Sequence, residues 1–224
     1  MLKCRSIKPN STDLSDLSGF SVIFNTESLY FYFRNAAYRD YVSNCENIFI
    51  DGAVLSLIAK LFLLDIKRYH GPDVLADLEH SGLLGNAILI GGSEQNKILV
   101  ENNILKSWVE LPYSHSPEVL AEAALAKLRH QTDARIVLIS LGLPKQELVA
   151  HVIGKKLGRS DLFFLPLGAA IDFRTGVAKR SSQVWTKFGF EWLPRLIREP
   201  RMLKRNVKSL IGAVYFLFHL LFNG

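Results

Sequence analysis

The sequence predicts an α/β protein: a mostly parallel sheet with helices on both faces, followed by a basic helical appendage at the C-terminus. Short apolar runs rich in Ile, Val, Leu and Phe alternate with longer runs of helical periodicity, which is the order that builds parallel sheets. Most of the short runs stop abruptly at glycine or at a polar residue. The length of 224 residues, 49% of them apolar, suits one compact domain with an appendage.

The expected strands are the apolar runs at 20–24, 47–50, 86–90, 135–141 and 161–167, with a weaker candidate at 108–111. Helical patterns occupy an aromatic-rich stretch up to about residue 44, the ranges 53–62, 74–84 and 117–130, and the segments that end near 106 and 157. Pro72 and Pro117 are placed to open two of these helices. The alternation predicts a Rossmann-like fold.

The chain divides into three parts by composition. Residues 1–19 form a polar lead-in, 20–180 hold the predicted α/β domain, and 181–224 form the appendage. The two cysteines, Cys4 and Cys45, lack metal-ligand spacing and indicate a reducing compartment. The first residues lack the apolar core of a secretory signal, so we expect a cytoplasmic protein.

The positive charge of the chain is concentrated near the C-terminus. Residues 174–208 hold ten Lys and Arg against two Glu, a net +8, so the rest of the chain sums to −2 within a total of +6. A run without formal charge, 209–222, follows; as a helix it would rise about 21 Å, less than the roughly 30 Å hydrocarbon core of a bilayer. Buried, interfacial and re-entrant placements remain open, and the adjacent basic residues favour the membrane interface.

Polar or glycine-rich groups follow five of the predicted strands: Asn25 with Glu27, Asp51 with Gly52, Gly91 with Gly92, the loop 142–147, and the loop 168–172. Ligands of open α/β sheets sit beyond the carboxyl ends of the strands, so these groups predict one polar cleft. Asp51 would present a carboxylate there, and Gly52 would let a substrate approach the backbone. The structural alternative is that Asp51 caps the next helix.

The turn at Gly91 and Gly92 could cradle a diphosphate through its backbone N–H groups. Neither a Gly-x-Gly-x-x-Gly pattern nor a P-loop is present, so a dinucleotide site is weakly supported. Arg68, together with Gly71 and Asp73, would form an anion-binding fork. An ordinary surface arginine beside a helix start explains the same residues equally well.

The loop 142–147 carries a second group of candidates. Glu147 suits the first turn of a helix whatever its function, whereas Gln146 has less structural reason to be there. The histidines form no metal-binding pattern, so we expect no metal site; they are His70, His80, His115, His130, His151 and His219.

Five motifs, in order along the chain, carry a resemblance to a known family: Asp51-Gly52; Arg68-x-x-Gly71-x-Asp73; Gly142-x-Pro144-Lys145-Gln146-Glu147; Gly168-x-x-x-Asp172-Phe173-x-x-Gly176; and Glu191-Trp192-x-x-Arg195-Leu196-x-x-Glu199-Pro200-Arg201. The chain resembles the WecG/TagA/CpsF glycosyltransferases, family 26, from about residue 20 to 205. The third and fifth motifs are the most specific.

The resemblance implies an inverting enzyme that transfers a hexose of the ManNAc, ManNAcA or glucose type from a UDP-sugar to a polyprenyl-diphosphate-linked saccharide. Such enzymes build exopolysaccharides, capsules and wall polymers at the inner face of the bacterial cytoplasmic membrane. It also implies metal-independent catalysis without a cofactor, and a C-terminal appendage that covers the site and contacts an anionic membrane. A homo-oligomer is compatible with it.

Roles for individual residues combine the same resemblance with the strand-end pattern described above. Asp51 is the expected general base, with Gln146 and Arg195 as further catalytic residues. The expected substrate-binding residues are Asn25, Gly52, Arg68, Gly71, Asp73, Gly91, Gly92, Gly142, Pro144, Lys145, Glu147, Gly168, Asp172, Arg180, Arg198 and Arg201.

Two alternatives belong to other functional classes. A nucleotide-dependent α/β enzyme of another kind would need a ribose-binding acid about twenty residues after Gly92, and Glu110 is the nearby candidate. A non-catalytic module would use the basic segment to bind nucleic acid or a membrane. Few aromatic residues accompany the basic ones, and the apolar run after them favours lipid over nucleic acid.

Overall fold

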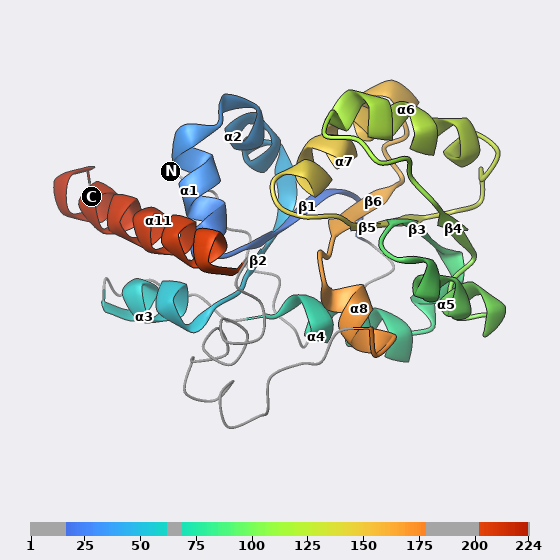
Figure 1. The fold of residues 1–224 in the computed structure, drawn as a ribbon, viewed down its shortest axis with the longest axis horizontal. Coiled ribbons are helices and arrows are strands. Elements are labelled where there is room, and N and C mark those ends of the chain that lie inside the picture. Colours follow the sequence, from blue (N-terminus) through green and yellow to red (C-terminus); the bar gives the residue numbers. More distant parts are fainter. Residues whose placement is uncertain (1–16, 62–68, 178–201, 224) are drawn as a thin grey trace.

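The computed structural model describes residues 17–61, 69–177 and 202–223 of the chain (Figure 1). The strands are β1 (Gly19–Phe24), β2 (Cys45–Ile50), β3 (Ala87–Gly91), β4 (Ser107–Val109), β5 (Ile136–Ser140) and β6 (Phe163–Pro166). The helices are α1 (Thr26–Arg34), α2 (Ala36–Ser43), α3 (Ala53–Leu61), α4 (Gly71–His80), α5 (Ile98–Glu101), α6 (Pro117–Leu128), α7 (Lys145–Leu157), α8 (Ala170–Arg174) and α11 (Met202–Asn223). Short 3-10 turns lie at Leu83–Asn86 and Glu94–Lys97.

The six strands form one sheet in the order β2-β1-β6-β5-β3-β4, and every neighbouring pair is parallel. The α/β prediction is therefore confirmed, including the weaker strand at β4. Because all strands run in one direction, all their carboxyl ends lie along the same edge of the sheet. This edge is where the polar groups of the sequence come together.

Helices cover both faces of the sheet (Figure 1). Successive strand residues alternate between two apolar cores, as a pleated strand requires: Ile88 and Ile90 pack in one core and Leu89 in the other. The first core also contains residues of α1, α2, α6 and α7, and the second contains residues of α4, α5 and α8. A sheet buried on both faces explains why its strands are continuously apolar.

Two helices differ from the sequence expectation. The aromatic-rich stretch before residue 44 forms two helices, because Asn35 ends α1 in an extended conformation and accepts a hydrogen bond from the Tyr38 N–H at the start of α2. The helix expected to reach residue 106 stops at Glu101. Asn103 adopts a left-handed φ of 56° there, a conformation that ends helices.

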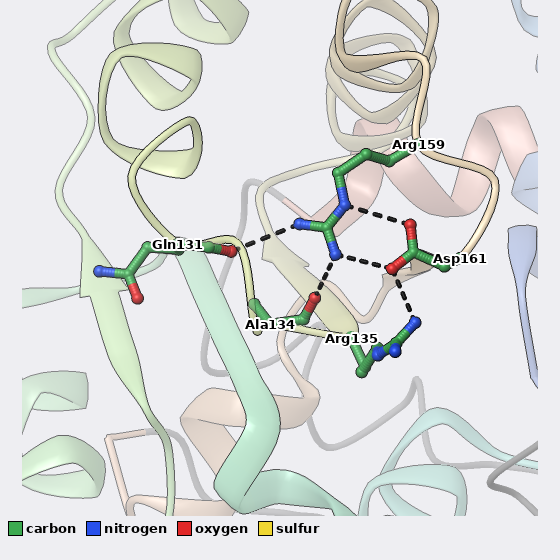
Figure 2. A network of polar contacts seen from close by, with 5 residues as sticks. All are labelled: Gln131, Ala134, Arg135, Arg159 and Asp161. Carbon is green, nitrogen blue, oxygen red and sulfur yellow. Dashed lines mark hydrogen bonds and ion pairs between the residues drawn. The ribbon is translucent and has the colours of Figure 1, made fainter.

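A charged network closes the amino edge of the sheet, opposite the polar edge (Figure 2). Arg159 donates from Nε and Nη2 to Asp161 at 3.1 and 2.7 Å, and from Nη2 to the Ala134 carbonyl at 2.9 Å. Arg135 bonds the same carboxylate at 2.7 Å. Hydrogen bonding from Arg159 lowers the pKa of Asp161 to about 2. These contacts join the segments that lead into β5 and β6, so the network at this edge stabilises the fold.

The C-terminal helix α11 packs along α1 (Figure 1). Gly212 allows the close approach, because an added Cβ would lie 2.1 Å from the Thr26 carbonyl oxygen and 2.7 Å from the Tyr30 nitrogen. The Lys208 ammonium lies 4.9 Å from the Phe31 ring centroid, a cation–π distance. Within the described residues, none of the helices combines the length and the apolarity needed to cross a membrane.

Several predicted features lie outside the described residues. These are the lead-in up to residue 16, the motif arginine Arg68, the end of the domain at 178–180 with Arg180, and the part of the appendage up to residue 201 with Arg195, Arg198 and Arg201. The boundary at 180/181 falls among these residues, and both it and the boundary at 19/20 stay predictions.

Gly212→Ala tests the packing of α11 on α1. In an isolated helix this substitution would stabilise by about 1 kcal/mol. Against α1, the new methyl group meets backbone atoms that cannot move aside, so we expect a loss of about 1–3 kcal/mol in the free energy of unfolding, measured by urea denaturation. Gly85→Ala is the control, since a Cβ there meets nothing within 4 Å. A Gly212→Ala protein as stable as wild type would contradict the described packing.

Candidate active site

A cleft of about 710 Å³ lies along the carboxyl edge of the sheet. Loops after β1, β2, β3, β5 and β6 line it, together with the start of α4 and one residue of α11. The lining residues are Ile23, Asn25, Glu27, Asp51, Gly71, Pro72, Gly92, Ser93, Ser140, Leu141, Gly142, Leu143, Gln146, Pro166, Leu167, Gly168, Ala169, Ala170, Asp172, Phe173, Val177 and Arg205. The five strand ends predicted to converge do meet here.

Asp51 follows β2 directly and lines the cleft. Its backbone N–H donates to the Phe24 carbonyl at 2.8 Å, which extends the pairing of β2 with β1 by one residue. Helix α3 begins at Ala53, and the Gly52 carbonyl accepts from the Ser56 N–H. The residue before the helix is therefore Gly52, with a φ of +99°, and not Asp51.

The Asp51 carboxylate has a histidine partner. His70 Nδ1 lies 2.5 Å from Asp51 Oδ1, and both side chains are partly buried. His70 stands at the amino end of α4, and it is not among the residues that line the cleft. Asp51 therefore lines the cleft, and the His70 imidazole contacts its carboxylate without lining the cleft itself.

The turn after β3 is built for close approach of the backbone. Gly91 and Gly92 have φ values of +74° and +82°, and a Cβ at Gly92 would lie 2.3 Å from Asn96 Nδ2. Ser93 Oγ is buried and has no hydrogen-bond partner among the described residues. A polar ligand in the cleft would satisfy this hydroxyl. The expected long helix after this turn is replaced by a 3-10 turn and the four-residue α5, so no long helix begins at this turn.

The loop after β6 is held at Gly168 from two sides. Its carbonyl accepts from Ser140 Oγ at 2.8 Å, and its N–H donates to Gln146 Oε1 at 2.9 Å. Gln146 Nε2 in turn donates to Glu147 Oε1 at 2.8 Å. The interpretation that Gln146 has little structural role is therefore wrong: its amide fixes one wall of the cleft while it also lines the cleft.

Glu147 lies beneath the cleft, completely buried in the first turn of α7. Burial raises its pKa to about 7, although the hydrogen bond from Gln146 opposes this shift. Its Oε2 has no hydrogen-bond partner among the described residues. A pKa of about 7 means that this buried carboxyl group is partly protonated near neutral pH.

Arg205 brings the C-terminal helix into the cleft. Its Nε donates to Glu27 Oε2 at 2.6 Å, and both residues line the cleft. Glu27 is buried in the first turn of α1, so this ion pair fixes the beginning of α11 against the sheet domain. The guanidinium has five N–H donors, and this bond uses one of them.

The far wall of the cleft is formed by α8. Asp172 lines the cleft, and the completely buried Asn96 donates from Nδ2 to its Oδ1 at 3.4 Å. Arg174 bonds Glu79 of α4 through Nε and Nη2 at 2.8 and 2.5 Å. The two-bond fork holds α8 to α4 and so fixes the spacing of two walls.

The predicted site residues fall into three groups. Those that line the cleft are Asn25, Asp51, Gly71, Gly92, Gly142, Gln146, Gly168 and Asp172. Those that lie beside or beneath it without lining it are Gly52, Asp73, Gly91, Pro144, Lys145 and Glu147. Those outside the described residues are Arg68, Arg180, Arg195, Arg198 and Arg201. Two of these residues have other contacts: Asn25 Oδ1 caps α1 through Ser28, and Lys145 Nζ donates to the Ser114 carbonyl at 3.0 Å.

The residues in or beside the cleft that are absent from the predicted set include His70, Ser93 and Arg205. Ser93 follows the glycine turn directly, so its position could have suggested it. His70 occupies a helix-capping position where Ser, Thr, Asp or Asn is usual, which is also a usable signal. Arg205 is one of many basic residues in its segment, and nothing local distinguishes it.

Within the described residues, no three His, Cys, Asp or Glu side chains gather in a way that could hold a metal ion. The expectation of a metal-independent, cofactor-free reaction stays a prediction.

An all-parallel sheet with a polar cleft at its carboxyl edge is the arrangement of a ligand-binding α/β enzyme. A family model, that of the Glycosyl transferase WecG/TagA/CpsF family, matches residues 11–224, and the chain belongs to this family. The match spans nearly the whole chain and confirms the resemblance that its motifs indicate. Members of the family are glycosyltransferases of cell-surface polysaccharide synthesis.

Glu147 makes stability depend on pH. Its pKa is about 7 in the folded protein against 4.5 for an unperturbed glutamate, so between these values the folded state holds a proton that the unfolded state has lost. The stabilising contribution is therefore complete below about pH 4.5, falls as pH rises, and is lost above about pH 7. We expect Glu147→Gln to flatten the decline of the urea midpoint between pH 5 and about pH 8. Glu110→Gln, at an exposed glutamate, is the control; an unchanged decline in Glu147→Gln would contradict this account.

Proposed function

We propose that this glycosyltransferase transfers a hexose from a UDP-sugar, with inversion, to a polyprenyl-diphosphate-linked saccharide. The observation that carries the proposal is one cleft that combines a carboxylate, Asp51, with a guanidinium from the C-terminal helix, Arg205. The volume of about 710 Å³ lies within the range of about 300–1,000 Å³ typical of small-molecule sites. It therefore suits a nucleotide-sugar together with the end of an acceptor.

In the proposed reaction Asp51 is the general base. It takes the proton of the acceptor hydroxyl while that oxygen attacks the anomeric carbon of the donor. The bond from the anomeric carbon to the diphosphate oxygen breaks on the opposite side, and UDP departs with the electron pair. A single carboxylate suffices, because the diphosphate leaves as a stable anion and needs no acid of the kind that glycoside hydrolysis requires.

Positive charge and hydrogen-bond donors in the cleft would support departure of UDP. Arg205 can bind the diphosphate while its Nε remains bonded to Glu27. The Ser93 hydroxyl, which has no partner among the described residues, is proposed as a further donor to the same group. Arg195, Arg198 and Arg201, which precede α11 in the chain, are proposed to add to this charge.

The two alternatives from the sequence are less well supported. Family membership favours transferase activity over a nucleotide-dependent enzyme of another class. A purely non-catalytic role leaves the carboxylate and the glycine turn of the cleft without a purpose. The hexose type, whether ManNAc, ManNAcA or glucose, and the polymer, whether exopolysaccharide, capsule or wall polymer, belong to the proposal.

We expect Asp51→Asn to reduce turnover by roughly 10²- to 10⁴-fold. The substitution keeps the size of the side chain and removes its basicity, so UDP-sugar binding should change little. Transfer to a short polyprenyl-diphosphate sugar is the assay, and calorimetric titration measures donor binding. Asp77→Asn on α4, outside the lining of the cleft, is the control. Wild-type turnover in folded Asp51→Asn would refute the base assignment.

We further propose that α11 holds the enzyme on the inner face of the cytoplasmic membrane. While one side of α11 packs on α1, large apolar residues remain exposed at three- and four-residue spacings along it: Leu203, Val207, Leu210, Val214, Phe218, Leu221 and Phe222. Lys204 is exposed in the first turns of the same helix. An exposed apolar stripe beside basic charge is the pattern of a helix that lies in an anionic membrane surface. The same stripe could instead contact a second copy of the chain.

Point substitutions on this stripe separate the two readings better than deletion of α11, which would also uncover α1. We expect Leu210→Ser with Phe218→Ser to lower sedimentation with anionic liposomes by at least about tenfold, since each side chain contributes about 1.5–3 kcal/mol when buried. Val119→Ser, at an exposed apolar residue of α6, is the control. Unchanged liposome binding, with a shift in molar mass by light scattering, would favour the second copy over the membrane.

A further inference from the structure

His70 occupies a helix-capping position without capping the helix. It is the residue before α4, with extended φ and ψ values of −81° and 152°, and its side chain makes no hydrogen bond to the helix. Ser, Thr, Asp and Asn are favoured at such positions because their side chains satisfy free N–H groups. The imidazole of His70 is instead directed to Asp51, 19 residues earlier in the chain. The side chain of His70 therefore does not cap the helix and instead contacts a residue that lines the cleft.

The backbone on both sides of His70 is anchored. The Tyr69 N–H donates to the Ile50 carbonyl at 2.8 Å, at the last residue of β2, and the Tyr69 ring packs on Phe49 with centroids 5.7 Å apart. After His70, the Asp73 and Val74 N–H groups both donate to the His70 carbonyl at 3.0 Å. The imidazole is therefore carried on a fixed segment that runs beside the end of β2.

We propose that His70 is a positioning residue that orients Asp51 for proton abstraction, an inference that rests on the proposed function of Asp51 as base. An ionised carboxylate can only accept hydrogen bonds, so the proton of the 2.5 Å contact belongs to Nδ1, which donates to Oδ1. This bond occupies one carboxylate oxygen and leaves Oδ2 for the acceptor hydroxyl. Within the described residues, His70 is the only side chain found bonded to this carboxylate.

Orientation matters because an aspartate can rotate about its last side-chain bond. Without a partner the carboxylate would sample many directions, and a misplacement of about 1 Å at a reacting group can cost about 10²-fold in rate. During the reaction the acceptor proton moves to Oδ2, and Nδ1–H keeps its hydrogen bond to Oδ1. No proton passes through the imidazole, and His70 returns unchanged. The role is thus orientation, which a different N–H donor of similar reach can also perform.

The test compares two substitutions of His70. Asparagine places an amide N–H near the position of Nδ1, whereas leucine fills similar space and offers no donor. We expect His70→Leu to lower kcat about 10- to 100-fold with an unchanged KM for the donor, and His70→Asn to recover most of the lost kcat. Thermal melts of both variants separate this effect from loss of folded protein, and Asp51→Asn serves as the inactive reference.

Each kinetic outcome supports or overturns the positioning role of His70. Wild-type kcat in His70→Leu would overturn the proposal while leaving the base assignment of Asp51 intact. Equal losses in both variants, as severe as that of Asp51→Asn, would make His70 itself the proton acceptor and also overturn it. Absence of transfer by the wild-type enzyme itself would refute the proposed function.

A second measurement needs no turnover. Nitrogen NMR of the histidine side chains should show His70 as the tautomer with its proton on Nδ1, and this preference should disappear in Asp51→Ala. The opposite tautomer in the wild-type protein would overturn the proposal regardless of the kinetics.

Discussion

The parallel direction of all six strands is the constraint on which the rest of the structure depends. The residues that follow the strands all lie at the same edge of the sheet. Residues far apart in the sequence therefore become neighbours there. Asp51 after β2, the glycine turn after β3 and the Gly168 loop after β6 reach one cleft in this way. If even one central strand were antiparallel, the residues that follow it would lie at the opposite edge, away from the cleft.

The two edges of the sheet differ in role: the contacts at the amino edge stabilise the fold, and the carboxyl edge carries the cleft. At the amino edge, Arg159 and Asp161 satisfy each other and nearby carbonyl groups in a closed network (Figure 2). At the carboxyl edge, the buried Ser93 hydroxyl has no hydrogen-bond partner among the described residues, and we propose that a ligand supplies one. Hydrogen bonds beneath the cleft hold this edge in place. Gln146, for example, bonds both Gly168 and the buried Glu147. Helix α11 completes the edge through the ion pair of Arg205 with Glu27.

Most of the fold and the outline of the cleft could be predicted from the sequence, because strand patterns are local and parallel topology determines where the strands end. What the sequence could not show depends on contacts between distant residues. His70 meets Asp51 across 19 residues and Arg205 meets Glu27 across 178, and neither pair is marked by a local pattern. The split at Asn35 was missed for a different reason: the helical pattern continues through a residue whose side chain caps the second helix, which is a local contact. Confirmation of the family supports the type of reaction, whereas the roles of single residues await experiment.

We propose that the carboxyl-edge cleft holds the nucleotide diphosphate of the donor between the glycine turn and the C-terminal helix. A crystal structure of the full chain with UDP tests it most directly. We expect the diphosphate against Gly92 and Ser93 and within hydrogen-bonding distance of Arg205, with its sugar-bearing end toward Asp51. UDP bound outside this cleft, for instance at the arginines of the amino edge, would refute this binding mode.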